Sequence, residues 1–411
     1  MRKAIAISLA FCLLGRIPLV FAQDHASSTP EDCYTTVTSP VLNETVLNSI
    51  HIKTVADIRA VRSELVSQIW GATGLPTTRL TSTAIVQTTP RNVASNASGL
   101  YASLTNLGYE QRLTVNLRTS PGIDSIVYQW IPKVSNRRLF IIHDGHSDDA
   151  YNVDGSLRSP GMSNSTNLAT ANTLLGLGYT ILWIQMPLYG DNLRSSPGVS
   201  LSGCPVTSDD WLNFSKCDRH QGLFDTFSNP LRYFVEPVIV AINTVLKQKR
   251  FTDITMMGAS GGGWTTVLSA AVDPRIRTSA SVAGSLPLFL PSASDTCRFS
   301  RDAEQLDHPG LLYESISYLD LYILAANGSE PHGGARGHLQ INNQFDSCCF
   351  FGMNFVGYEG VLESYIAEHR LGNYAYHLDT TFVGHGYDVT DPKGPKPVNN
   401  TLNFVLNALN R

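Results

Sequence analysis

Three short, almost entirely apolar segments separated by helical patterns constrain the fold of this chain most strongly. They are "RRLFIIHDG" at residues 137–145, "YTILWIQMP" at 179–187 and "DITMMG" at 253–258. Near-continuous apolar character is typical of parallel strands that are covered on both faces. A helical pattern closed by glycine lies between the first two segments, and a longer one at 231–250 precedes the third. The alternation predicts an α/β domain with a mostly parallel, doubly wound sheet and helices on both faces.

The flanking segments extend this sheet. Residues 109–119 and 123–133 alternate apolar and polar side chains, which predicts a hairpin of half-buried strands. Further strands are expected at 278–284, 338–343 and 374–380, and further helices at 165–178, 264–274, 358–372 and 399–410. Two insertions, at about 188–230 and about 285–318, interrupt the alternation, and we expect them to form lids and substrate walls.

The N-terminal quarter of the chain differs from the rest. Residues 1–22 have basic residues, an apolar run too short to span a membrane, and small residues for cleavage, which predicts a secretory signal peptide. Residues 23–105 are rich in Ser, Thr and Asn, and we interpret them as an extension draped on the core. One helix is expected in it, with Thr54 as N-cap, Asp57 three residues later and Gly71 at its end. The α/β domain then occupies 106–411.

Charge and cysteine content fit an exported protein. Removing Arg2, Lys3 and Arg16 with the signal changes the formal net charge from −4 to −7, and this mild acidity argues against a nucleic-acid partner. Six cysteines remain, which allows three disulfides. We expect Cys204 to pair with Cys217, and the adjacent Cys348 and Cys349 to reach separately toward Cys297 and Cys33.

Six N-x-S/T sequons suggest glycosylation, at Asn43, Asn96, Asn164, Asn213, Asn327 and Asn399.

A single serine stands among glycines where the third apolar segment ends, in Gly258-Ala259-Ser260-Gly261-Gly262. A strand leads into this G-x-S-x-G match and a helix leads out, and such a turn strains the serine and exposes its hydroxyl. A plain tight turn is the alternative. On this motif, residues 106–411 resemble the α/β-hydrolase superfamily, and secreted serine esterases within it. The resemblance implies a nucleophile, an acid and a histidine in that chain order.

The resemblance assigns the histidine to "TTFVGHGYD", where His385 follows the last expected strand. A histidine base is needed because a neutral hydroxyl attacks poorly unless its proton is removed. We interpret His377, inside the strand pattern, as a packed or surface residue. The acid falls on Asp346 in "HLQINNQFDSCCF", where it would orient the imidazole. Glu330 and Asp379 are the rival acids.

An oxyanion hole needs two preorganised donors. The resemblance implies the Gly261 N–H as the first, and the second from the loop after residues 137–145, which departs from the family's His-Gly-Gly motif. Gly145 and His146 are both candidates there, and His146 is equally a candidate substrate contact or helix cap.

These features predict a secreted serine hydrolase that cleaves carboxylic esters through an acyl-enzyme on Ser260, His385 and Asp346. A serine peptidase of the same fold and a catalytically silent binding module are the alternatives. No zinc-type cysteine spacing or phosphate-binding glycine loop is present, so we expect no cofactor and no metal. The expected partner is a small-molecule or polymeric ester, with no membrane span and an unknown oligomeric state.

Overall fold

The computed structural model describes residues 34–35, 41–88, 104–117, 123–146, 165–194, 199, 201, 219–290, 302–306, 312–328, 336–387, 402 and 405–406. Its strands are β1 (Ile85–Thr88), β2 (Leu107–Leu117), β3 (Ile123–Pro132), β4 (Arg138–His143), β5 (Thr180–Ile184), β6 (Asp253–Ala259), β7 (Thr278–Val282), β8 (Gly337–Phe345) and β9 (Asn373–Val383). Its helices are α2 (Asn43–Asn48), α3 (Val55–Trp70), α4 (Ser165–Gly176), α5 (Gly190–Arg194), α6 (Arg219–Thr226), α7 (Arg232–Gln248), α8 (Gly261–Val272), α9 (Tyr318–Ala326) and α10 (Glu359–Glu368). None of the helices in this part of the chain is both long enough and apolar enough to cross a membrane.

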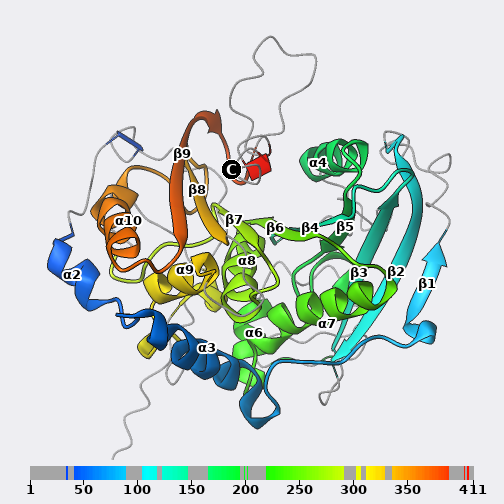
Figure 1. Cartoon of the computed structure of the whole chain (residues 1–411), viewed down its shortest axis with the longest axis horizontal. Coiled ribbons are helices and arrows are strands. Elements are labelled where there is room, and N and C mark those ends of the chain that lie inside the picture. The colour runs from blue at the N-terminus through cyan, green and yellow to red at the C-terminus, as the bar shows by residue number, and fades with distance from the viewer. Residues whose placement is uncertain are drawn as a thin grey trace, which may run out of the picture.

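The nine strands form one sheet in the order β1-β2-β3-β5-β4-β6-β7-β8-β9. From β5 to β9 every neighbouring pair is parallel, while β1, β2 and β3 are joined to one another and to β5 in antiparallel fashion. The expected hairpin is the pair β2 and β3. The mostly parallel sheet predicted from the sequence is therefore confirmed, and Figure 1 shows it running through the middle of the molecule.

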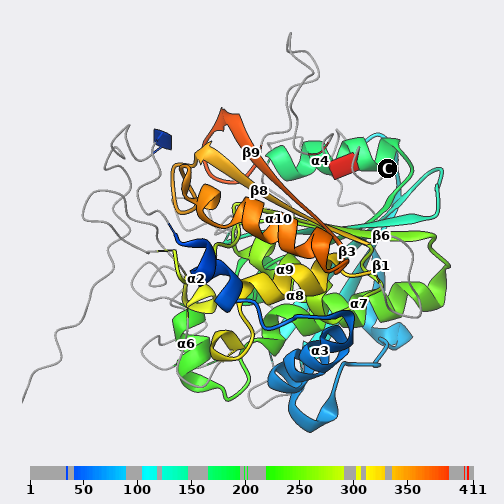
Figure 2. The same cartoon turned by 60° about the vertical axis from the view of Figure 1, so that its left-hand side comes forward.

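Alternate residues of one strand pack on opposite faces of the sheet. Leu139 and Ile141 of β4 belong to one buried apolar cluster, whereas Phe140 and Ile142 belong to the other. Helices α3, α7, α8, α9 and α10 contribute to the first cluster, and α4 contributes to the second, so the helices lie on both sides of the sheet (Figures 1 and 2). Burial on both faces explains why the central strands are apolar throughout.

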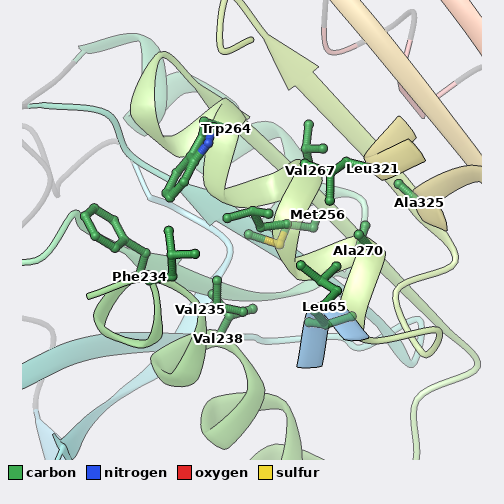
Figure 3. Close-up of a cluster of buried hydrophobic side chains, with 14 of the residues drawn as sticks. Leu65, Phe234, Val235, Val238, Met256, Trp264, Val267, Ala270, Leu321 and Ala325 are labelled. Atoms are coloured by element: carbon green, nitrogen blue, oxygen red, sulfur yellow. The ribbon is translucent and has the colours of Figure 1, made fainter. Parts of the chain in front are cut away.

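The larger cluster holds α8 against the sheet and against its neighbouring helices. Figure 3 shows Trp264 and Val267 of α8 beside Phe234 of α7, Met256 of β6 and Leu321 of α9. The rings of Phe234 and Trp264 pack edge to face with centroids 5.1 Å apart, a preferred geometry for aromatic pairs. Close packing of this kind fixes the position of α8, and with it the turn that begins the helix.

The N-terminal extension is part of this core rather than a cover on it. Helix α3 has the predicted capping box between Thr54 and Asp57, and it ends at Gly71 with a φ of 60°. The sequence predicted only this helix, but α2 and β1 are also present, and β1 adds an antiparallel strand beside β2. Buried side chains of the extension join the larger cluster: Val46, Ile50, Ile52, Ile58, Leu65, Ile69 and Trp70. The prediction of a draped segment missed this burial.

A buried arginine connects the extension to the ends of two core helices. The Arg62 guanidinium donates from Nε to the Ala271 carbonyl of α8 at 2.8 Å and from Nη2 to the Leu324 carbonyl of α9 at 3.0 Å. Both carbonyls lie in the last turn of their helix, where no intrahelical donor remains and a positive charge is favourable. Arg62, which is distant in sequence, therefore helps to cap the C-terminal ends of α8 and α9.

We expect Arg62→Ala to lower the free energy of unfolding by about 3 kcal/mol, because two charge-assisted hydrogen bonds are lost. The Ala271 carbonyl loses the Arg62 donor, whereas the Leu324 carbonyl still accepts from Arg336 Nη1 at 3.1 Å. Denaturant titration followed by circular dichroism measures this change. Arg59→Ala, at an exposed position on the same helix, is the matched control and should change stability by less than about 0.5 kcal/mol. Equal effects of the two substitutions would show that Arg62 is not a link to the core.

Candidate active site

The strand order places a topological switch point between β4 and β6. The chain leaves β4 to form β5 on one side, and later returns to form β6 on the other side of β4. The two strands end level with each other, because His143 pairs with Gly258 in the parallel register. Loops that diverge at such a switch point leave room for a ligand beyond the carboxyl ends of the strands. Both the Ser260 turn and the Gly145–His146 loop begin there.

Ser260 is the strained residue that the glycine-rich sequence predicted. It has φ 55° and ψ −131°, and it precedes the first residue of α8 as its N-cap. L-residues rarely adopt this conformation, which costs about 1–3 kcal/mol and persists only where the surroundings enforce it. The Ser260 N–H donates to the Val282 carbonyl of β7 at 2.9 Å, and its own carbonyl accepts from Gly263 N–H at 2.8 Å. These bonds hold the turn from both ends.

Two glycines allow the turn to close. A side chain at Gly258 would overlap the carbonyl of Gly262, and one at Gly262 would overlap the carbonyl of His143. Backbone packed this closely leaves no room for a Cβ atom. The spacing of the glycines in the motif therefore reflects contact between the end of β6, the start of α8 and the end of β4.

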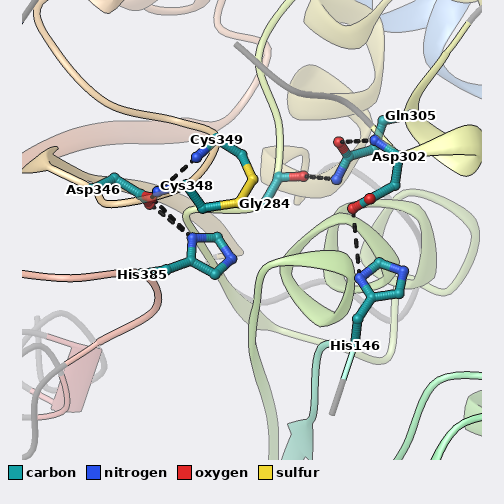
Figure 4. The surroundings of a disulfide bond; sticks show 8 residues. All are labelled: His146, Gly284, Asp302, Gln305, Asp346, Cys348, Cys349 and His385. Carbon is teal, nitrogen blue, oxygen red and sulfur yellow. Dashed lines mark hydrogen bonds and ion pairs between the residues drawn. A yellow bond between two sulfur atoms is a disulfide. The ribbon is translucent and has the colours of Figure 1, made fainter. Parts of the chain in front are cut away.

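Asp346 and His385, the residues predicted as acid and histidine, lie together. His385 Nδ1 is 3.0 Å from Oδ1 and 2.9 Å from Oδ2 of Asp346 (Figure 4). The carboxylate is fully buried, whereas the imidazole is 26% exposed. Asp346 Oδ1 also accepts the backbone N–H groups of Cys348 at 2.7 Å and Cys349 at 3.1 Å. Because a buried carboxylate without partners is costly, these bonds stabilise it and fix its position.

The loop that carries His385 reaches the serine turn. Asn343 of β8 donates its amide to the Gly386 carbonyl at 2.6 Å and to the Gly384 carbonyl at 3.2 Å, which anchors both sides of the histidine. A Cβ on Gly386 would lie 4.0 Å from Cβ of Ala259, next to Ser260. Among the described residues, Ser260 Oγ makes no hydrogen bond, including to His385. Hydrogen bonds of this type are often long in a free enzyme and tighten only when substrate binds.

The rival residues have other roles or lie outside the described residues. Asp379 Oδ1 accepts from Thr381 N–H and hydroxyl at 2.8 Å and from Phe382 N–H at 3.0 Å, within its own strand β9. His377 is partly buried in the same strand, and this burial lowers its pKa. Glu330 falls outside the described residues.

The predicted cysteine pairing is wrong for the two adjacent cysteines. Cys348 and Cys349 are bonded to each other (Figure 4), instead of reaching separately toward Cys297 and Cys33. Their backbone N–H groups bind the same carboxylate oxygen of Asp346, and the resulting tight turn keeps the two sulfur atoms together. Cys33, Cys204, Cys217 and Cys297 lie outside the described residues.

The sequons include one that is inaccessible. Asn327 is buried, with 1% of its surface exposed, and it donates its amide to the Leu371 carbonyl at 2.6 Å. A glycan cannot be attached there in the folded chain, whereas Asn43 is exposed. Asn96, Asn164, Asn213 and Asn399 lie outside the described residues.

The candidate oxyanion donors surround the serine. Gly261 opens α8, and the first N–H groups of a helix have no intrahelical partner. A Cβ on Gly145 would lie 2.9 Å from Cβ of Ser260, so only glycine lets this loop approach the serine so closely. The Gly145 N–H, however, donates to Asp144 Oδ1 at 3.1 Å. His146, the other predicted candidate, follows Gly145 in the same loop.

The side chain of His146 belongs to a cluster that the sequence did not reveal. His146 Nε2 lies 2.9 Å from Nδ1 of His220 and 3.1 Å from Oε1 of Glu304, and His220 Nδ1 lies 3.0 Å from Oε2 of Glu304. Burial alone would raise the pKa of Glu304, but His220 and His146 outweigh this effect and lower it. His220 and Glu304 come from the two insertions and have no motif spacing, so only the fold brings them to His146.

Comparison with known proteins gives likeness in fold alone. No family model and no curated protein matches the chain. Among solved structures, a methylesterase is similar at 17% identity and a TM-score of 0.49, over 85% of this chain and 65% of that one, slightly under two thirds of its length. Acetyl xylan esterase 1 from Thermoanaerobacterium sp. JW/SL YS485 is similar at 13% identity and a TM-score of 0.43, over 87% and 96% of the two chains. Acetyl xylan esterase from Paenibacillus sp. R4 is similar at 13% identity and a TM-score of 0.41, over 80% and 87%.

The topology of the sheet and the positions of three residues after its strands agree with the fold that the sequence predicted. A mostly parallel sheet with helices on both faces places the strained Ser260 turn after β6, Asp346 after β8 and His385 after β9. The three residues that the resemblance singled out therefore each follow a strand of the parallel part of the sheet. The chain has the fold of the α/β-hydrolases.

Proposed function

We propose that this protein is a secreted serine hydrolase that cleaves carboxylic esters, with Ser260 as nucleophile, His385 as general base and Asp346 as the orienting acid. The observation that carries the proposal is the pairing of His385 Nδ1 with both oxygens of the buried Asp346. His385 lies in the loop after β9, and Gly386 of that loop packs beside Ala259, the residue before Ser260.

The pairing determines which nitrogen of His385 can act. A carboxylate accepts hydrogen bonds and donates none, so Nδ1 carries a proton and Nε2 of the neutral ring carries a lone pair. That lone pair removes the Ser260 proton as Oγ attacks the ester carbonyl, and the buried carboxylate stabilises the imidazolium. The imidazolium returns the proton to the leaving alcohol. Water then repeats the sequence and releases the acid from the acyl-enzyme.

The oxygen of the tetrahedral intermediate would lie at the start of α8. The Gly261 N–H and the His146 backbone N–H are the proposed donors, and the positive end of the α8 dipole favours the same negative charge. The β4 loop comes close to the turn at residues 258–262, which we call the elbow, at the point where Gly145 meets Ser260. An ester is the simplest substrate for this arrangement, because its carbonyl is less stabilised by resonance than that of an amide and is attacked more readily.

Labelling with a fluorophosphonate probe tests the proposal. We expect the purified protein to be labelled at Ser260 alone, and to hydrolyse p-nitrophenyl acetate but not the corresponding p-nitroanilide. Mass spectrometry of the labelled peptide identifies the site. A folded protein that is neither labelled nor active on the ester would contradict the serine mechanism, and turnover of the anilide at the same rate would favour a peptidase. The proposal of secretion rests on residues 1–22, and N-terminal sequencing of protein from the medium tests it.

A further inference from the structure

The cluster of His146, His220 and Glu304 lies beside the elbow and has no part in the proposed reaction sequence through its side chains. His146 follows β4, His220 is on α6, and Glu304 is in the 3₁₀ turn Ala303–Gln305. His220 is 1% exposed and Glu304 is fully buried. A Cβ on Gly261 would lie 2.8 Å from Cε1 of His146 and 3.2 Å from Oε1 of Glu304. The cluster therefore borders the first residue of α8.

With both imidazole rings neutral, hydrogen bonds do not account for the arrangement. His220 Nε2 lies 3.1 Å from the Pro187 carbonyl, which can only accept, so Nε2 carries a proton and the neutral ring has a lone pair at Nδ1. That lone pair faces Oε2 of Glu304 at 3.0 Å, another group without a proton. Three contacts of 2.9 to 3.1 Å join the three groups. Neutral rings supply too few protons for all of them.

The glutamate has a second unusual feature. Its Oε1 is buried and accepts no hydrogen bond among the described residues, although His146 Nε2 is 3.1 Å away. A buried carboxylate oxygen without a donor is costly. A metal cation between the three groups would bind Oε1 and both nitrogen lone pairs, and would remove this cost.

The distances and the outer partners fit zinc. Zn–N and Zn–O bonds of about 2.0–2.1 Å in a tetrahedron place ligand atoms about 3.3 Å apart, close to the separations in the cluster. Two histidines and one glutamate are also a familiar zinc ligand set that leaves a fourth position open. Each histidine has an acceptor at its other nitrogen, Pro187 O for His220 and Asp302 Oδ2 at 3.5 Å for His146 (Figure 4). Metal-binding histidines are oriented by such acceptors.

We propose that His146 Nε2, His220 Nδ1 and Glu304 bind one Zn²⁺ ion beside the elbow. The ion connects the β4 loop to both insertions and so fixes the loop in which Gly145 touches Ser260. This inference concerns metal binding and does not depend on the proposed ester hydrolysis.

Zinc content of the tag-free, full-length chain tests the site. After removal of metal with a chelator and incubation with ZnCl₂, we expect one equivalent of bound zinc by elemental analysis and a rise in Tm of about 5 °C. Glu304→Gln should weaken binding at least 100-fold in competition with a chelating dye. Asp302→Asn, which leaves all three ligands in place, should weaken it about 10- to 100-fold. His377→Ala, outside the cluster, is the control and should bind as the unmodified protein does.

The opposite results would overturn the proposal. One such result is less than about 0.1 equivalent of zinc bound by the folded protein. The other is the same zinc affinity in Glu304→Gln, Asp302→Asn and the control. Fluorophosphonate labelling is measured on the same samples, so the two proposals fail separately. A protein that is labelled but binds no zinc would contradict only the metal site. A protein that binds zinc but is not labelled would contradict only the serine mechanism.

Discussion

Ser260→Ala is expected to lower kcat for p-nitrophenyl acetate by about 10⁵- to 10⁶-fold, since the nucleophile of such a triad accounts for nearly all of its contribution. Labelling by the fluorophosphonate should disappear. The fold should remain, because alanine meets the same backbone strain at φ 55° that serine already meets. Steady-state kinetics and circular dichroism measure the two effects.

Two further variants make this result specific. Ser269→Ala is the matched control on α8, because the Ser269 hydroxyl is buried without a hydrogen-bond partner among the described residues, and its removal should leave activity unchanged. Ser260→Gly should be as inactive as Ser260→Ala but more stable by about 1 kcal/mol, since glycine relieves the left-handed strain. Retained activity in Ser260→Ala would move the chemistry elsewhere. A glycine variant that is less stable than the alanine variant would mean that the turn is not strained.

Asp346→Asn is expected to lower kcat about 10⁴-fold with little loss of stability. The asparagine amide would donate to His385 Nδ1 and move the ring proton to Nε2, which then cannot accept the Ser260 proton. The oxygen of the amide can still accept the N–H groups of Cys348 and Cys349, so the turn is kept. Esterase kinetics together with a thermal melt distinguish lost chemistry from lost structure.

Asp379→Asn is the matched control for this prediction. Asp379 is also a buried carboxylate, in the edge strand β9. It accepts hydrogen bonds from Thr381 and Phe382 of the same strand. We expect its substitution to leave kcat within about threefold of the unmodified protein and to affect mainly stability. If Asp379→Asn lost activity and Asp346→Asn retained it, the assignment of the acid would be reversed.

Several elements of the fold could be predicted because the residues that determine them are close together in the sequence. Continuous apolar runs identified β4, β5 and β6, and the Thr54–Asp57 box and Gly71 gave both ends of α3. The glycines around Ser260 indicated a strained turn, since no other residue fits where Gly258 meets Gly262. Asp346 and His385 could be chosen because each follows a strand in an expected position.

The remaining features depend on contacts between distant residues. Arg62 meets carbonyls 209 and 262 residues away, and nothing in its own helix indicates that it is buried. His220 and Glu304 lie 84 residues apart in insertions without clear periodicity. Tertiary packing decides both of these cases. The bond between Cys348 and Cys349 is different, because it accompanies a local turn in which Asp346 accepts both of their N–H groups.

The bonds between the extension and α9 have a consequence for how the chain folds during synthesis. Asp320 Oδ1 accepts the N–H groups of His51 at 2.8 Å and Ile52 at 3.0 Å, and His51 is 269 residues earlier in the chain. At a synthesis rate of about 5–20 residues per second, the ribosome makes the extension roughly 13 to 54 s before its partners. During that interval Ile50, Ile52 and Leu65 lack α9 and the rest of the C-terminal part of their cluster, so we expect the nascent chain to expose apolar surface that chaperones can bind.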